Sequence, residues 1–530
     1  MDETAVATFT PPNGTTVTVT TVTGFTNADF TVTAPLSSLT FDIPSGLTYS
    51  VSNYLSEAAT WSSITFQGGG TLLARGSSHH GGPSGRAGIN NTLVITNGTV
   101  FLATGGLEVG RHSNSRSNLF LVSNAQCEVG TSFYIGRDGR YNQAIINDNA
   151  ALVCGTGIWV GSGSSSSGNS LLIDHATVTS LATSHIGNSG ENNCAEVTNN
   201  GEWTITNGVL HVGQNASRNE VKVTGGGKLN LVDLRLGANA TGHENAVIAE
   251  GVNSSVAVRG FPGTNNLWVG QSGRSNSLQI LDGASFTSTI NVLLANNASS
   301  SSNTFLLSNA SGEMHREFQI GRQGCYNEVL ISNGASLLVS NLVSVGNNTG
   351  ASNNTLRVES GGTLTAKAAL IIGNNASASN NAMRVENGTV DIGGALTVSR
   401  AGTLTLAGTN PVVIVRQASG VGMTINDGSA LRFEFDTVAP TGPLIDVATG
   451  SLSVTNPGAM VIDAEKLARA GGGKDICLLQ VGTASGPALT ALKNSFDAVA
   501  STGRITLRVE DDLRLVCDVA GEGGTLILVK

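Results

Sequence analysis

The chain has 530 residues, of which 40% are hydrophobic and only 12% charged, and its formal net charge is −9. This acidic balance excludes a general nucleic-acid binder, which needs a basic surface, and no apolar run approaches the length of a membrane-spanning helix. With 68 glycines and so few charges, solubility must come from Ser, Thr, Asn and Gly, which is typical of stacked strands joined by polar turns and argues against helical bundles.

The first 75 residues contain short stretches in which apolar and polar residues alternate, such as 15–20 and 63–66. Alternation with a period of two, bounded by Gly, Pro or Asn, predicts strands. We interpret residues 1–75 as an N-terminal cap with irregular coils, which protects the first edge of a repeat array. Because Met1-Asp2-Glu3-Thr4 lacks the basic and apolar regions of a signal peptide, we expect that an export signal has been removed.

Residues 76–400 repeat one plan, seen clearly in 327–346, NEVLISNGASLLVSNLVSVG. Each unit opens with an asparagine, and the opening positions are Asn91, Asn118, Asn142, Asn169, Asn193, Asn219, Asn245, Asn276, Asn303, Asn327, Asn354 and Asn381. Each unit closes with a glycine, at Gly110, Gly136, Gly161, Gly187, Gly213, Gly237, Gly270, Gly321, Gly346 and Gly373, with Ala295 and Ser399 at the two remaining positions. The mean step is about 26 residues, so the array has about twelve units.

Apolar residues stand two and four places after each asparagine, as at Leu93 and Ile95, and three and one places before each glycine, as at Leu107 and Val109. Since alternate residues of a strand share one face, each unit supplies two inward-facing strands with a third, shorter strand between them. The solution we predict is a parallel β-helix with an apolar interior and coils about 4.8 Å apart, hence a rod of about 60 Å. The asparagine amides would form a hydrogen-bonded ladder, and the glycines would occupy corners with positive φ.

Two further features concern the organisation of the chain. Residues 118–143 resemble 303–328, 185 positions later, which indicates duplication of a block of coils. The regular plan fades after residue 400, and we interpret 401–530 as a C-terminal β-rich capping domain with one helix over about 487–500. Cys477 and Cys517 lie in two late apolar strands, where a disulfide or two small buried thiols would fit equally well.

The unit Asn…LxVxNGgxL…LxVG resembles the repeats of large bacterial surface and secreted β-helix proteins, such as autotransporter passengers and the repetitive exported proteins of Verrucomicrobia-like and Planctomycetes-like bacteria. The resemblance covers residues 90–400. It implies a right-handed β-helix and an extracellular or cell-surface location, but no activity. β-Helix polysaccharide lyases and hydrolases share this fold, and none of their catalytic motifs is clearly placed in this chain.

Arginines recur in the turn between closing glycine and opening asparagine, and they are Arg86, Arg111, Arg116, Arg137, Arg140, Arg218, Arg274 and Arg322. Arg111 and Arg137 each follow a closing glycine, and Arg116 and Arg140 each stand two places before an asparagine, so stacking should bring the four together beside Tyr141 and His112. Like charges so close need counter-charges, which Asp138 supplies only in part. An anionic sugar is a natural partner, since Arg binds carboxylate and sulfate in bidentate fashion; a solvated polar turn is the alternative.

Other kinds of site find little support. The acids of the repeats are scattered, whereas a glycosidase needs a pair that faces one groove. Calcium-binding turns of the GGxGxDxUx type are absent, the six cysteines have no zinc-site spacing, and we expect neither metal nor cofactor. His79 and His80 lie in a predicted loop over 76–89, where they are solvated or, with a third partner, ligate an ion. No GxSxG elbow or nucleotide-binding fingerprint has the right context.

The regularity of the array favours a non-enzymatic extracellular structural or adhesive rod that associates with itself, in fibres or a surface layer, or with a cell-surface polysaccharide. Two alternatives stay open. One is a lyase of anionic polysaccharides that uses the arginine cluster to neutralise a uronate, with Tyr141 or His112 as base. The other is a polysaccharide-binding protein without catalysis, with Arg111, Arg116, Arg137, Arg140 and Tyr141 as its site.

Overall fold

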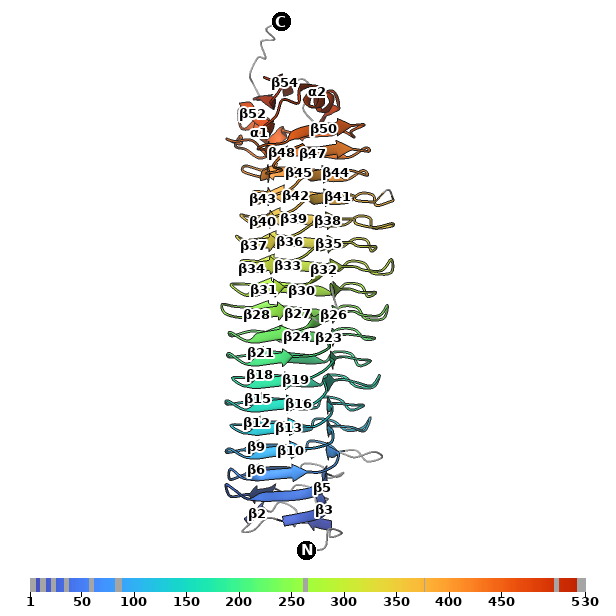
Figure 1. The fold of residues 1–530 in the computed structure, drawn as a ribbon, viewed down its shortest axis with the longest axis vertical. Coiled ribbons are helices and arrows are strands. Elements are labelled where there is room, and N and C mark those ends of the chain that lie inside the picture. Colours follow the sequence, from blue (N-terminus) through green and yellow to red (C-terminus); the bar gives the residue numbers. More distant parts are fainter. Residues whose placement is uncertain are drawn as a thin grey trace. The chain divides into compact units, whose positions relative to one another are not determined.

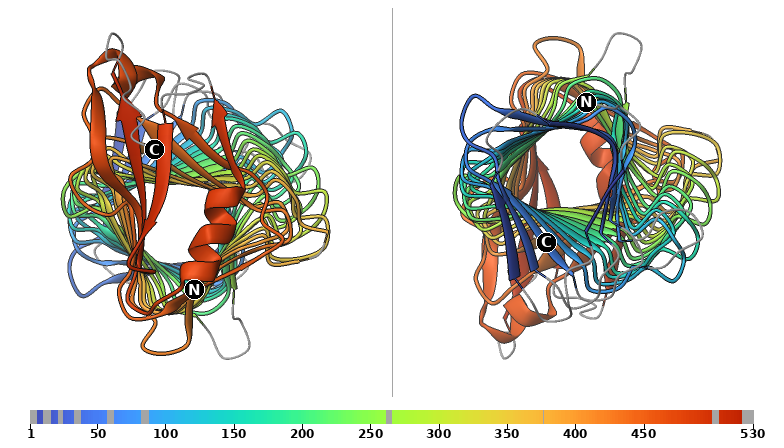
Figure 2. Two further views of the ribbon diagram at one scale, coloured as in Figure 1. Left: turned by 90° about the horizontal axis from the view of Figure 1, so that it is seen from above. Right: turned by 90° about the horizontal axis from the view of Figure 1, so that it is seen from below.

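The computed structural model describes residues 6–9, 16–20, 25–32, 38–56, 62–81, 88–260, 266–375, 377–499 and 505–521. The chain divides into two compact units, residues 1–278 with 283–285 (unit 1) and residues 279–282 with 286–530 (unit 2). Both units are built from short parallel strands stacked coil upon coil (Figure 1). Seen end-on, the strands of successive coils overlie one another within each unit (Figure 2).

Each regular coil has three strands, which we call first, second and third. The first strands are, in unit 1, β2 (Thr16–Thr20), β4 (Ser38–Asp42), β6 (Ser63–Gln67), β9 (Thr92–Thr96), β12 (Leu119–Ser123), β15 (Gln143–Asn147), β18 (Ser170–Asp174), β21 (Cys194–Thr198), β24 (Glu220–Val223) and β27 (Ala246–Glu250), and, in unit 2, β33 (Thr304–Ser308), β36 (Glu328–Ser332), β39 (Thr355–Glu359), β42 (Ala382–Glu386), β45 (Thr403–Gly408), β48 (Ala430–Phe435), β51 (Met460–Asp463) and β53 (Phe496–Val499). β30 (Ser277–Leu281) contains residues of both units.

The second strands are, in unit 1, β7 (Thr71–Ala74), β10 (Val100–Ala103), β13 (Gln126–Val129), β16 (Ala151–Cys154), β19 (Thr177–Ser180), β22 (Glu202–Ile205), β25 (Lys228–Leu231) and β28 (Ser255–Val258), and, in unit 2, β34 (Ser311–Met314), β37 (Ser336–Val339), β40 (Thr363–Ala366), β43 (Thr389–Ile392), β46 (Val412–Val415) and β49 (Ile445–Val447), while β31 (Ser285–Ser288) has residues of both. The third strands are, in unit 1, β8 (Ser78–His80), β11 (Leu107–Val109), β14 (Phe133–Ile135), β17 (Ile158–Val160), β20 (Ser184–Ile186), β23 (Val209–Val212), β26 (Asp233–Leu236) and β29 (Asn266–Val269), and, in unit 2, β32 (Asn291–Leu294), β35 (Phe318–Ile320), β38 (Val343–Val345), β41 (Leu370–Ile372), β44 (Leu396–Val398), β47 (Val421–Asn426) and β50 (Ser451–Thr455).

The predicted parallel solenoid is confirmed by the strand register. Val100 pairs with Gln126, and Gln126 pairs with Ala151, so one coil takes 26 residues and the next takes 25. Phe120 and Val122 of β12 point inward, are fully buried and pair with Ala144 and Ile146 of β15. Burial of each large apolar side chain contributes about 1.5–3 kcal/mol, and this term recurs in every coil. In the coil of β12, β13 and β14 the third strand, not the predicted middle one, is the shortest of the three.

The solenoid extends past both of the boundaries that the repeat pattern suggested. Before residue 76, β2, β4, β6 and β9 pair in parallel and in register. β1 (Val6–Phe9), β3 (Phe25–Val32) and β5 (Thr48–Ser56) do the same, and β5 is long enough to pair with both β7 and β8. After residue 400, β42, β45, β48 and β51 continue the stack. The Asn–Gly signature ends near residue 400, whereas the inward alternation that builds the core does not.

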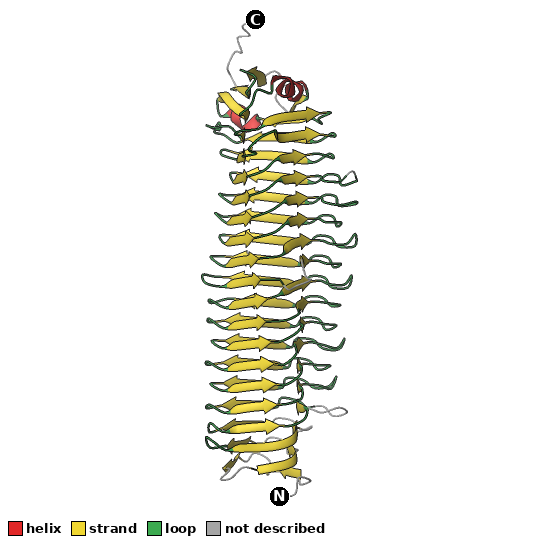
Figure 3. Cartoon of the chain, viewed as in Figure 1, coloured by secondary structure: helices red, strands yellow, loops and turns green. Residues whose placement is uncertain are grey.

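The end of unit 2 changes character. α1 (Glu465–Arg469) and α2 (Gly486–Asn494) are the two helices of the described residues (Figure 3). β52 (Gly472–Val481) and β54 (Ile505–Glu510) both pair antiparallel with β55 (Arg514–Ala520). The predicted helix over 487–500 is therefore too long: Leu489 and Leu492 are its buried residues, but Phe496 begins strand β53. Cys477 and Cys517 are unpaired, because register places Val516 and Ile476 opposite them.

Candidate functional site

The predicted asparagine ladder is present in both units, and its members are buried, with exposures of 1% or less. The Oδ1 atom of Asn142 accepts hydrogen bonds from the backbone N–H of Asn118 (3.2 Å) and from its Nδ2 (2.8 Å). The second Nδ2 hydrogen of Asn118 is donated to the Gly88 carbonyl (2.9 Å). The same bonds between ladder amides recur from Asn91 to Asn276 in unit 1 and from Asn303 to Asn381 in unit 2. A buried amide stabilises the fold only when all its groups are bonded, and here they are.

The closing glycines serve the ladder as well as the turn. They have the predicted positive φ, for example 67° at Gly136 and 73° at Gly346. In addition, a Cβ atom on Gly136 would lie 2.2 Å from the Asn169 side chain, and one on Gly346 would lie 2.1 Å from Asn381 Nδ2. Gly136 and Gly346 therefore leave the space that a ladder amide fills, whereas a Cβ atom on Gly373 would meet the Ser399 carbonyl instead. Ala295, which stands at a closing position, has a φ of 58°. Ser399 stands at the last closing position, and there the two residues that follow it have the positive φ values.

A third regular position was missed in the sequence. The residue before each ladder asparagine has a positive φ close to 55–67° in all twelve repeats, and these residues are Asn90, Ser117, Tyr141, Gly168, Asn192, Arg218, Glu244, Ser275, Ser302, Tyr326, Asn353 and Asn380. The frequent Asn, Ser and Gly were a usable signal, because short polar residues and glycine tolerate this conformation best. We call this the pre-ladder position.

The arginine cluster is only partly as predicted. Arg111 Nε lies 3.2 Å from Glu108 Oε2, and Arg137 Nη1 lies 2.6 Å from Glu108 Oε1. Glu108, on β11, is 7% exposed and pairs in register with Tyr134. The hydrogen bond to Glu108 is the main reason why the pKa of Arg137 is raised. Arg111 and Arg137 thus share one internal counter-charge, Glu108, and binding of an external anion by these two residues stays a prediction.

Arg116 and Arg140 do share a station, since they form a parallel β-bridge in successive coils, and both are exposed. Arg140 Nε donates to the Ser165 carbonyl (3.2 Å). Within the described part of the chain, neither guanidinium makes an ion pair. Tyr141, which follows Arg140, is 63% exposed.

The other predicted cluster members are dispersed. Arg218 pairs with Glu191, Arg322 donates to Asn296 Oδ1 (2.8 Å), and Arg86 lies outside the described residues. His112 accepts a hydrogen bond from the Asn114 N–H at its Nδ1 (3.1 Å).

His79 and His80 are not in a loop: they belong to strand β8 and point to opposite sides. Arg111 Nη1 donates to His79 Nε2 (2.7 Å), so this ring is an acceptor there and carries its proton on Nδ1. His80 lies in the interior, fully buried, with Nε2 3.2 Å from the Asn91 carbonyl, and burial lowers its pKa to about 4. Because the two side chains diverge, they do not form a shared metal site.

The outward middle residues of the third strands form a continuous column in unit 1, which we call the outward column. It consists of His79, Glu108, Tyr134, Trp159, His185, His211, Arg235 and Trp268, each in register with the next. The rings of Tyr134 and Trp159 stack at 5.7 Å, those of Trp159 and His185 at 3.8 Å, and those of His185 and His211 at 4.8 Å. Alternation within a strand predicts that these residues face outward, but their stacking from coil to coil follows only from the register of the third strands.

The buried members of the outward column are electrostatically coupled. His185 and His211 are 5% and 8% exposed. Burial, reinforced by His211, lowers the pKa of His185 to about 3, and burial, reinforced by Arg235, lowers that of His211 to about 4. Arg235 Nη2 lies 3.0 Å from Asp233 Oδ2, and burial raises the pKa of Asp233 despite this partner. His185 and His211 are therefore neutral at physiological pH, and together with Tyr134 and Trp159 they form a stack of uncharged rings within the column.

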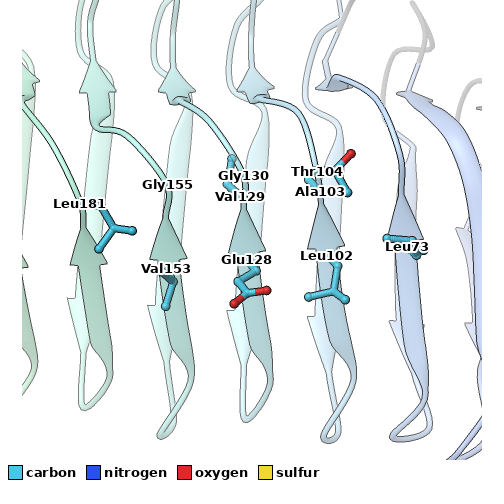
Figure 4. A pocket seen from close by; sticks show the side chains of 10 residues that line it. All are labelled: Leu73, Leu102, Ala103, Thr104, Glu128, Val129, Gly130, Val153, Gly155 and Leu181. Carbon is cyan, nitrogen blue, oxygen red and sulfur yellow. The ribbon is translucent and has the colours of Figure 1, made fainter.

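An apolar depression of about 410 Å³ lies on the outer side of the second strands of unit 1. Leu102, Glu128 and Val153 project into it from β10, β13 and β16 (Figure 4). Gly130 and Gly155 line it and have no room for a side chain, since a Cβ atom on either would lie within 2.3 Å of a neighbouring carbonyl oxygen. Glu128 is the one charged residue of its lining, so the depression has no pair of groups for acid–base chemistry.

Among the described residues, no group of three or more His, Cys, Asp or Glu side chains is placed to hold a metal ion. In the same part of the chain, no helix is long and apolar enough to cross a membrane. The chain matches no protein-family profile, no curated protein and no solved structure.

Proposed function

We propose that the protein is a non-enzymatic structural or adhesive solenoid that acts outside the cell or at its surface. The observation that supports this proposal best is the use of its polar groups. The buried amides bond to one another, Glu108 pairs with both Arg111 and Arg137, and the aromatic and histidine rings of the outward column stack on one another. Groups engaged in this way build a scaffold, whereas an enzyme leaves a poised acid, base or nucleophile facing a cavity.

The partners that we propose are further copies of the chain or a polysaccharide of the cell surface. Lysis of an anionic polysaccharide, the enzymatic alternative, requires a base beside a uronate-binding cluster. Two of the four arginines of the candidate cluster, Arg111 and Arg137, are paired with Glu108. This favours binding without turnover over lysis.

Two measurements test this proposal together. Negative-stain electron microscopy and light scattering report whether the purified protein forms filaments or sheets. Incubation with polygalacturonate and with alginate, followed by absorbance of unsaturated products, reports lysis. We expect filaments or sheets if the partner is a further copy of the chain, and in every case no increase in absorbance; a steady increase, lost in an Arg116→Gln/Arg140→Gln variant, would refute the non-enzymatic function.

A further inference from the structure

The pre-ladder position imposes a left-handed backbone on whichever residue occupies it. The Tyr141 N–H donates to the Ser167 carbonyl (2.9 Å), and the Tyr326 N–H donates to the Ser352 carbonyl (3.1 Å) in the next coil. These bonds belong to the coil and do not depend on the side chain. Positive φ is unusual for a bulky residue and costs free energy that Asn or Gly would avoid. The strain at Tyr141 (φ 55°) and Tyr326 (φ 59°) is therefore a property of the chosen side chain.

Packing does not compensate for this strain, because both tyrosines are 63% exposed. Tyr141 nevertheless has a defined place. Gly168 occupies the pre-ladder position of the next coil, and a Cβ atom there would lie 2.5 Å from Tyr141 Cδ1 and 2.6 Å from Cε1. The ring thus lies over the bare backbone of Gly168, with most of its surface open to solvent. An exposed, positioned aromatic ring is a surface for recognition.

Two arginines lie close to this tyrosine along the backbone. Arg140 precedes Tyr141, and Arg116 pairs with Arg140 across one coil spacing, about 4.8 Å. The nearby arginines 111 and 137 share one carboxylate, Glu108, whereas Arg116 and Arg140 have no carboxylate partner among the described residues. Two adjacent guanidiniums of this kind attract a carboxylate or sulfate.

We propose that Tyr141, supported by Gly168 and flanked by Arg116 and Arg140, is a binding site for an acidic sugar of a polysaccharide. The apolar face of a pyranose ring stacks on Tyr141, and its carboxylate or sulfate group is bound by the two guanidiniums. This inference rests on the proposed non-enzymatic function, since it names the ligand class of an adhesive surface.

Unit 2 provides a matched control for this site. Tyr326 has the same conformation and exposure, but its neighbours at the arginine stations are Ser301 and Cys325, which form the corresponding bridge. The next pre-ladder residue is Asn353 in place of Gly168. Tyr326 therefore has the strained ring without the charges and without the recess, and it should not bind acidic sugars.

Affinity electrophoresis and calorimetry of the full chain, with polygalacturonate (carboxylate), chondroitin sulfate (carboxylate and sulfate) and neutral dextran as probes, test the site. We expect the parent to bind one or both acidic polymers and not dextran. Tyr141→Asn and Arg116→Gln/Arg140→Gln should each weaken binding by about tenfold or more, and added salt should weaken it further. Gly168→Asn, which keeps the backbone conformation but fills the recess, should weaken binding similarly, while Tyr326→Asn should leave it unchanged.

Thermal denaturation separates loss of the site from loss of the fold. Tyr141→Asn places a favoured residue in the left-handed conformation, so its midpoint should be no lower than that of the parent while its binding falls. Absence of binding by the parent, or equal binding by parent and Tyr141→Asn, would overturn the site but leave the structural function standing. Release of unsaturated products would instead overturn the non-enzymatic function, even if binding depended on Tyr141.

Discussion

Units 1 and 2 have the same kind of apolar interior but differ in the outward residues of their third strands. In both units, residues that flank the middle of the third strand are buried aliphatic side chains, such as Leu107 and Val109 in unit 1 and Val343 and Val345 in unit 2. The middle residues are charged or aromatic in unit 1, from Glu108 to Arg235. In unit 2 they are smaller and uncharged, namely Gln319, Ser344, Ile371, Thr397 and Thr424. Inward positions are fixed by packing, whereas outward positions are free to differ, so the features that distinguish the two units lie outside.

The ladder should matter equally in both units, which is the strongest test of their common interior. Asn169→Ala in unit 1 and Asn354→Ala in unit 2 each remove a buried amide and take one hydrogen-bond partner from the ladder amide on either side. We expect each variant to lose about 3–5 kcal/mol of stability, measured by chemical denaturation. A much smaller loss in one unit would show that the ladder is not a common support, and Asn114→Ala, at an exposed turn, serves as the control.

The closing glycines should follow the same rule. Gly136→Ala and Gly321→Ala each place a Cβ atom 2.2 Å from a ladder amide, at a φ of 67°. We expect a loss of about 2–4 kcal/mol in each case, from steric clash and backbone strain. Ala295→Gly is the reverse change and should gain up to about 1 kcal/mol. Denaturation midpoints of the three variants check these signs, and a neutral Gly136→Ala would contradict the steric account.

Acid should distinguish the units, because the histidine stack belongs to unit 1. The pKa values of His185 and His211 are about 3 and 4 in the folded chain and 6.5 ordinarily. Below pH 6.5 the two histidines bind protons in the unfolded chain but stay neutral in the folded chain. The free energy of unfolding therefore falls as the pH decreases from 6.5 toward the folded pKa values. At pH 5 the loss is about 2 kcal/mol for each histidine. The side chains that face His185 and His211 are Trp159 and Arg235, and Arg235 is paired with Asp233.

The His185→Gln/His211→Gln variant should lose this part of the pH dependence. We would compare the denaturation midpoints of parent and variant at pH 7 and pH 5, with the Thr397→Gln/Thr424→Gln variant as the control in unit 2. The parent and the control should lose stability together on acidification, and the histidine variant should lose less. Identical slopes for all three proteins would contradict the buried neutral stack.

The smallest effect is expected at the arginine cluster. Glu108→Gln removes the counter-charge of Arg111 and Arg137, whose side chains are 30% and 43% exposed and so partly hydrated. We therefore expect a loss of about 1–2 kcal/mol that shrinks at high salt. Arg322→Gln, which breaks the corresponding bond to Asn296 in unit 2, should cost less than about 0.5 kcal/mol. If Glu108→Gln and Arg322→Gln lost the same stability at every salt concentration, the charge of Glu108 would contribute little.

The repeated elements could be predicted from sequence because one physical constraint recurs in every coil. Asn142 and Gly136 are identified by their regular spacing, and their roles follow from amide hydrogen bonding and from the need for a positive φ. The cluster at Glu108 could not be derived in this way, because it combines strand residues with turn residues that are about 30 positions apart. The partner of Arg137 emerges only when β11 and β14 are placed in register. His79 and His80 were predicted to lie in a loop, because no opening asparagine precedes them to mark a repeat unit.

The burial of the ladder has a consequence for the chemical ageing of the protein. Asparagine deamidates when the following backbone nitrogen can reach its side chain, and a following glycine makes this easiest. No ladder asparagine precedes a glycine, whereas Asn97, Asn333 and Asn387 at exposed turns do. Spontaneous deamidation would therefore accumulate at exposed turns of the surface while the amides that hold successive coils together stay intact.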